Sequence, residues 1–200
     1  MSYDDDDAAR DAWYEKVSNQ AVDDFMMERL RSYYVANPAV MRPAVDALLE
    51  AQRLYKNGHY AATVLFSASC IEILLKITIL KPVFYGLVHN ERLADVVVEK
   101  IFGKTGYDIN LLGRIFSEFV NTDIKTIVRD GAKKSLMEEC NDLRTQRNKI
   151  THSGASCSCE EAALGITLAT VIYEEIVRVV LYNLGLHNIE KGMIVPIPSR

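Results

Sequence analysis

The segment from Leu143 to Gly154 gathers side chains that can do chemistry on a phosphate group. It reads Leu-Arg-Thr-Gln-Arg-Asn-Lys-Ile-Thr-His-Ser-Gly and places three cations, an asparagine and a histidine at the end of an expected helix. An arginine can hold a phosphate and its developing charge through paired N–H donors. A histidine that titrates near neutrality can take or give a proton. The segment therefore predicts a phosphate-facing pair, Arg147 and His152.

The spacing of this segment divides its side chains between two faces of a helix. Arg144, Arg147 and Thr151 share one face through their i, i+3 and i+7 spacing. His152 follows Arg147 by five residues, which is roughly 140° around an ideal helix. If the last turn tightens or unwinds before Gly154, the histidine can swing toward the arginine. The helix C-terminus would also favour the cationic form of the histidine.

This arrangement resembles the motif of HEPN domains, an arginine often followed by a polar residue, with a histidine four to six residues after the arginine. Arg147-Asn148 with His152 matches that pattern. The segment 60–76, which starts Tyr-Ala-Ala and ends Glu-Ile-Leu-Leu-Lys, resembles an earlier helix of the same family. The resemblance covers residues 43–184 and leaves the first 40 residues outside it.

The resemblance implies an all-α, HEPN-like up-and-down helical bundle with an extra N-terminal helix, which often dimerises and pairs two motifs across a cleft. It implies a cytoplasmic endoribonuclease that uses no metal or other cofactor, acting as a toxin or as a phage-defence or stress effector. The expected partners are RNA, a second copy and a cognate antitoxin or regulatory protein, with no membrane. The expected site comprises catalytic Arg147, His152 and Asn148, substrate-binding Arg144, Lys149 and Thr151, and Glu72 as a supporting partner of Arg147.

Other interpretations of the same residues stay open. The domain can be a catalytically inactive module that binds a nucleotide or RNA, or a structural helical interaction protein. Arg147 can simply pair with Glu72, and His152 can cap a carbonyl. Glu72 can instead pair with Lys76 at i+4 spacing. A further group of cations either extends a phosphate-binding patch toward the motif or forms a solvated loop: Lys125, Arg129, Lys133 and Lys134.

Composition narrows the class of protein. The chain has 200 residues, of which 49% are apolar and 25% charged, as in a globular domain. With a net charge of -4, the whole molecule does not attract nucleic acid, so a nucleic-acid surface must be a local basic patch. The N-terminus lacks a signal-peptide pattern, and charges interrupt every long apolar run. The four cysteines lack a zinc-ribbon spacing and are expected to be free thiols.

Hydrophobic periodicity predicts helices and no sheet, because no segment alternates with period two for long enough. The expected helices span residues 11–35, 43–56, 59–80, 92–102, 110–128, 133–152 and 160–184, with a connection over 82–89 and stops at Asn37-Pro38, Asn57-Gly58, Gly103, Asp130-Gly131 and Gly185. The expected organisation is an acidic tail plus N-terminal helix (1–40), a helical bundle (41–186) and an extended C-terminal tail (187–200).

Overall fold

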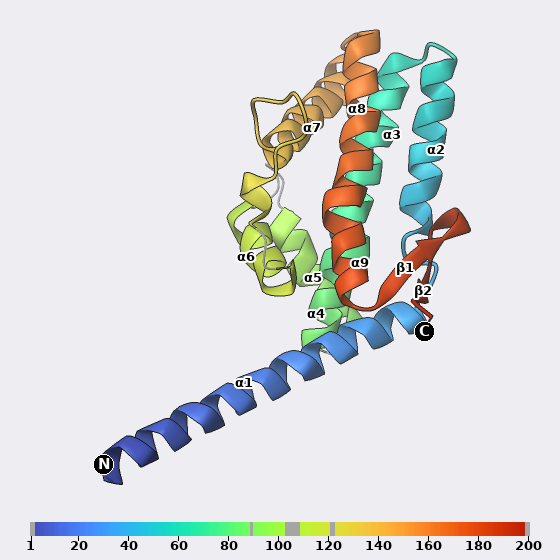
Figure 1. Cartoon of the computed structure of the whole chain (residues 1–200). Coiled ribbons are helices and arrows are strands. Elements are labelled where there is room, and N and C mark those ends of the chain that lie inside the picture. The colour runs from blue at the N-terminus through green and yellow to red at the C-terminus, as the bar shows by residue number, and fades with distance from the viewer. Residues whose placement is uncertain (1–2, 89, 103–108, 121–122, 199–200) are drawn as a thin grey trace.

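The computed structural model describes residues 3–88, 90–102, 109–120 and 123–198, and they are mostly helical, as predicted (Figure 1). The elements are α1 (Tyr3–Ala36), α2 (Arg42–Lys56), α3 (Tyr60–Ile73), η1 (Leu74–Leu80), α4 (Lys81–Val88), α5 (Glu91–Phe102), α6 (Ile109–Val120), η2 (Ile124–Thr126), α7 (Leu136–Ser153), α8 (Cys159–Ile172), η3 (Tyr173–Val177), α9 (Arg178–Asn183), β1 (Leu186–Ile189), η4 (Glu190–Gly192) and β2 (Met193–Pro196).

Helix α3 lies at the centre of the bundle and packs against α2, α7 and α8. In Figure 1, α2 and α7 run in one direction and α3 and α8 in the other. Small residues let these helices approach closely, since a Cβ added at Gly165 in α8 would lie 3.1 Å from the Ser67 Cβ and 3.3 Å from the Leu143 Cδ1. This three-helix contact fixes how α7 sits against α3 and α8.

The expected connection over 82–89 is wrong up to Val88, since α3, η1 and α4 form one continuous helix from Tyr60; residue 89 lies outside the described residues. In an α-helix the Thr78 carbonyl would accept a hydrogen bond from residue 82, but Pro82 has no N–H. The π-helical turns of η1 precede the proline, and the buried Tyr34 hydroxyl of α1 donates to the Thr78 carbonyl instead. A tertiary contact thus replaces the missing local bond.

Replacing Tyr34 with phenylalanine should therefore lower the free energy of unfolding by about 1–3 kcal/mol, because a buried carbonyl loses its donor. Urea denaturation of Tyr34→Phe would measure the loss. Tyr182→Phe is the matched control, since Tyr182 is 70% exposed and should tolerate loss of its hydroxyl. Equal stability of the two variants would contradict this role for Tyr34.

Two other boundaries differ from the prediction, and a third is not described. The acidic N-terminal residues are not a separate tail, because α1 already begins at Tyr3. The helix expected over 110–128 ends at Val120, and the Asp123 side chain accepts a hydrogen bond from the Lys125 N–H and starts the short 3₁₀ turn η2. The predicted stop at Gly103 lies outside the described residues.

The C-terminal segment is a two-stranded antiparallel hairpin, so the expectation of an extended tail and no sheet is wrong. The Ile194 N–H donates to the Pro38 carbonyl at 2.8 Å, and the Leu186 and Ile194 side chains are buried. Gly192 has a φ of +71°, and a Cβ there would come within 2.7 Å of Val45 in α2. Four-residue strands are too short to show alternation, so only packing beside α1 and α2 reveals them.

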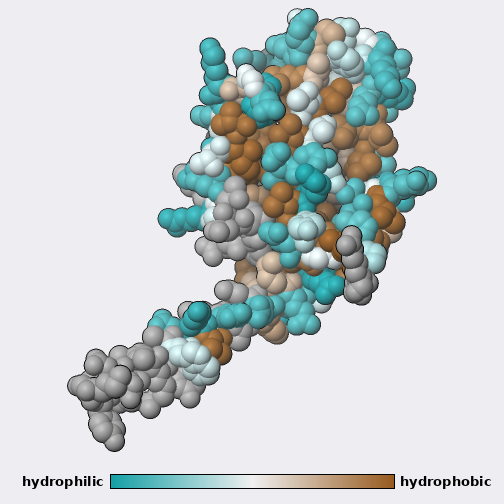
Figure 2. Space-filling view, in the orientation of Figure 1, coloured by the Kyte–Doolittle hydropathy of each residue, from teal (hydrophilic) through white to brown (hydrophobic). Residues whose placement is uncertain are grey.

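Helix α1 extends away from the bundle along most of its length (Figure 1). Its C-terminal part packs against α4 and β2 and buries Leu30 and Tyr34. The surface of its projecting part is mainly hydrophilic where it is coloured, although Trp13 and Phe25 are exposed (Figure 2). The projecting part of α1 therefore contributes little to the core that positions the motif helix.

The continuous helix from Tyr60 to Val88 is long and apolar enough to cross a membrane. However, 61% of its most apolar stretch is buried inside the bundle. Packing of a core helix is therefore sufficient to explain its composition.

Candidate functional site

Local signals at both ends fix the extent of the motif helix. Ser135 caps the N-terminus of α7 and forms a capping box with Glu138. Gly154 ends the helix in the left-handed conformation, with a φ of 62°. The motif from Arg147 to His152 is consequently helical throughout, and the last turn does not unwind.

This regular helix separates the two expected catalytic side chains. Arg147 is half-buried and His152 is exposed. With all intervening residues helical, they point roughly 140° apart around α7. Within one copy of the chain, the structure therefore does not bring the arginine and the histidine onto a common phosphate.

Asn148 is the expected site residue that the structure does place against Arg147. The Arg147 Nη1 donates to the Asn148 Oδ1 at 3.0 Å, which holds the guanidinium near the surface of the helix end. The exposed Thr151 hydroxyl donates to the Arg147 carbonyl at 2.9 Å. Arg144 lies one turn earlier on the Arg147 side of α7, whereas Lys149 shares the His152 side through i, i+3 spacing.

Glu72 takes neither of its two expected partners. Among the described residues it has no ion pair with Arg147 or Lys76. The register of the bundle gives the reason, because Ser67 in α3 lies level with Leu143 in α7 and the two helices run antiparallel. Glu72 lies five residues beyond Ser67 in α3, and Arg147 lies four residues beyond Leu143 in α7. Because these steps run in opposite directions, Glu72 and Arg147 are about 13 Å apart along the bundle. Glu72 is not a direct partner of Arg147 in this structure.

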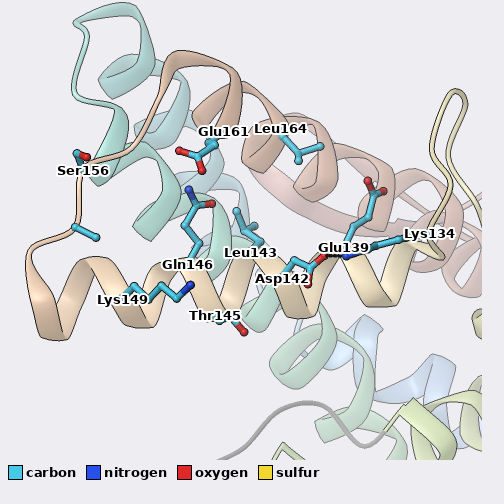
Figure 3. A pocket seen from close by; sticks show the side chains of 11 residues that line it. Lys134, Glu139, Asp142, Leu143, Thr145, Gln146, Lys149, Ser156, Glu161 and Leu164 are labelled. Carbon is cyan, nitrogen blue, oxygen red and sulfur yellow. Dashed lines mark hydrogen bonds and ion pairs between the residues drawn. The ribbon is translucent and has the colours of Figure 1, made fainter.

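A groove of about 590 Å³ lies beside the motif, between α7 and α8, and we call it the α7–α8 groove (Figure 3). Gln146 rises from α7 toward Glu161 of α8, and Lys149 lies along α7 toward Thr145. The full lining is Lys134, Glu139, Asp142, Leu143, Thr145, Gln146, Lys149, Ala155, Ser156, Glu161 and Leu164.

The carboxylates that line the α7–α8 groove are already engaged. Asp142 pairs with Lys134 at 2.6 Å, and its hydrogen bond raises the pKa of that lysine. Glu139 receives two 2.8 Å hydrogen bonds from Arg129. Glu161 accepts from the Ser158 N–H in the capping box of α8. Lys149 is left as the one charged lining residue without a hydrogen-bonded or ion-paired partner among the described residues.

These ion pairs contradict one of the two interpretations of the cations that precede the motif helix, namely that they extend a phosphate-binding patch toward the motif. Arg129 and Lys134 are held by acidic side chains of α7. Lys125 and Lys133 are exposed on the connecting segment. The solvated-loop alternative describes these two better than a patch continuous with Arg144 and Lys149.

Four residues that line the groove were not among the predicted site residues: Thr145, Gln146, Ser156 and Leu164. A signal existed for the α7 members, since Asp142, Thr145, Gln146 and Lys149 recur at i, i+3, i+4 and i+7 and must share a face. No local signal says that the loop after Gly154 and the first turns of α8 form the opposite wall.

The cysteines are free thiols, as predicted. Burial raises the pKa of Cys140 to about 12. The Tyr55 hydroxyl lies 3.1 Å from the Cys159 Sγ, whereas the Cys157 Sγ lies 3.8 Å from the Gln146 Nε2, so the two thiols face different helices. Within the described parts of the chain, no three His, Cys, Asp or Glu side chains are grouped closely enough to hold a metal ion.

No protein-family model, curated protein or solved structure matches this chain. The side chains at the end of α7 and the motif they form are therefore the features of the chain that bear on its function.

Proposed function

We propose that this chain is a HEPN-type endoribonuclease that cleaves RNA without a metal ion and acts in the cytoplasm as a homodimer. The observation that carries the proposal is the end of α7. There, Arg147 is held by Asn148 and the exposed His152 has no partner among the described residues. The order of elements supports it, since a helical hairpin precedes the motif helix and a long helix follows it.

The reaction needs only a base, an acid and a phosphate clamp. The ribose 2′-oxygen attacks the adjacent phosphorus while a base removes its proton, and the bond to the 5′-oxygen breaks as that oxygen gains a proton. The products are a 2′,3′-cyclic phosphate and a free 5′-hydroxyl. His152 can serve in one of the proton transfers, Arg147 can bind the non-bridging oxygens, and Asn148 keeps the guanidinium in place. Arg144 and Thr151 would contact the RNA backbone from the Arg147 side.

The proposed site needs two copies of the chain. Because His152 and Arg147 point away from each other around α7, the histidine of one copy would act with the arginine of the other across a two-fold axis. Such an enzyme would need restraint in the cell, for which we propose a cognate antitoxin or other regulatory partner, in a toxin, stress or phage-defence setting.

Cleavage of a labelled single-stranded RNA in EDTA tests this function. We expect the wild-type protein to cut the RNA and leave 2′,3′-cyclic phosphate ends, and His152→Ala to cut about 10²–10⁴-fold more slowly. His59→Ala is the matched control, because His59 is also exposed and lies before α3. Cleavage that is lost in EDTA would argue for a metal, and unchanged cleavage by His152→Ala would remove this histidine from the mechanism.

A second candidate is a catalytically inactive HEPN module that binds a nucleotide or RNA. The separation of Arg147 from His152 within one copy favours it, since binding needs no converging acid or base. This candidate predicts RNA binding that depends on Arg147, with no cleavage product under any condition.

A further inference from the structure

We propose that the α7–α8 groove binds one unpaired nucleotide of a single-stranded RNA, next to the phosphate that is cleaved, and that the Lys149 ammonium holds the phosphate of that nucleotide. This inference rests on the proposed function. It adds a binding site outside the Arg147–Asn148 pair and names single-stranded RNA as the substrate class.

The position of Lys149 connects the groove to the motif. Lys149 lines the groove and precedes His152 by three residues, so the two side chains are neighbours on the surface of α7. An RNA strand with its reactive phosphate at His152 would pass Lys149 directly and continue into the groove.

The charges of the lining residues favour a ligand with a single anionic group at the Lys149 end of the groove. Asp142 and Glu139 are ion-paired with Lys134 and Arg129, and the Glu161 carboxylate accepts a hydrogen bond from the Ser158 N–H at the N-terminus of α8, where a negative charge is favoured. Lys149 has no partner among the described residues. In an RNA, the phosphate is the group that complements an ammonium without a partner.

The remaining lining suits a base. Leu143, Leu164 and Ala155 supply apolar surface, and the Gln146 amide supplies both a donor and an acceptor for a base edge (Figure 3). A volume of about 590 Å³ falls within the range of small-ligand sites and holds one nucleotide, but no duplex. Because a paired base could not enter, the substrate at this position must be single-stranded.

Fluorescence anisotropy with a short labelled single-stranded RNA tests the inference in the full chain carrying His152→Ala, which slows cutting. We expect Lys149→Ala to weaken binding roughly tenfold and Gln146→Leu a few-fold. Lys149→Ala should also reduce the slope of log K against log salt concentration by about 0.7, as expected when one phosphate contact is lost, whereas Gln146→Leu should leave the slope unchanged. Lys100→Ala, an exposed lysine of α5, is the matched control and should bind like the parent.

The inference is overturned if both groove variants bind with the affinity and salt slope of the parent, if the parent binds no RNA, or if it binds a duplex as well as the single strand. These failures are distinguishable from failure of the proposed function. Groove variants that bind like the parent, and that cut normally when His152 is restored, would leave an active ribonuclease without this subsite. Weakened binding in the groove variants, with no cutting by the wild-type protein, would leave an RNA-binding module.

Discussion

An equimolar mixture of Arg147→Ala and His152→Ala chains should regain about a quarter of wild-type RNA cleavage, because random pairing makes half of the dimers mixed and each mixed dimer keeps one intact site of two. Alone, the histidine variant should lose about 10²–10⁴-fold in rate, from loss of proton transfer. The arginine variant should lose about 10²–10³-fold, from loss of charge stabilisation. The physical basis is the regular helix through Ser153, which keeps the two side chains of one copy on different faces of α7.

The control for this experiment is a mixture of His152→Ala with the double variant Arg147→Ala/His152→Ala. That mixture contains no wild-type histidine and should regain nothing. Native mass spectrometry would confirm that subunits exchange and mixed dimers form. Mixed dimers that form without any recovery of cleavage would show that the reaction does not combine residues of two copies.

Substituting valine for Gly165 should lower the free energy of unfolding by about 1–3 kcal/mol, through overpacking. Even a Cβ at this position meets Ser67 at 3.1 Å and Leu143 at 3.3 Å, so a branched side chain must push α3 or α7 away. Because Leu143 lies on the motif helix, we also expect a loss of RNA cleavage beyond the unfolded fraction. Urea denaturation and cleavage assays on the same samples would measure both effects.

Gly86→Ala is the matched control for this substitution. Gly86 is also helical, and a Cβ there has no neighbour within 4 Å among the atoms the structure describes. Alanine favours a helix over glycine by up to about 1 kcal/mol, so this variant should be as stable as the wild type or slightly more stable. If Gly165→Val were as stable as the wild type, the contact between α3, α7 and α8 would not restrict the packing of α7.

Local signals made most of the helices predictable. The turn at Asn57-Gly58, the left-handed Gly154 and Gly185, and the apolar stripes act over a few residues, so their effect is visible in the sequence. The error at Pro82 has the opposite origin, because a hydroxyl from Tyr34, 44 residues away, satisfies the carbonyl that the proline leaves without a donor. The C-terminal hairpin was missed for a similar reason, since it is held by Pro38 and α2.

The sequence by itself determined the order Arg147, Asn148 and His152, their place at the end of a helix, and the glycine that ends it. Those properties depend on neighbours within about one turn, where side chains and backbone compete for the same hydrogen bonds. Only the tertiary structure decided that Glu72 lies level with a different part of α7, and that α8 forms the opposite wall of a groove that Lys149 lines. Those properties depend on the register between helices, which side-chain packing sets across the whole bundle.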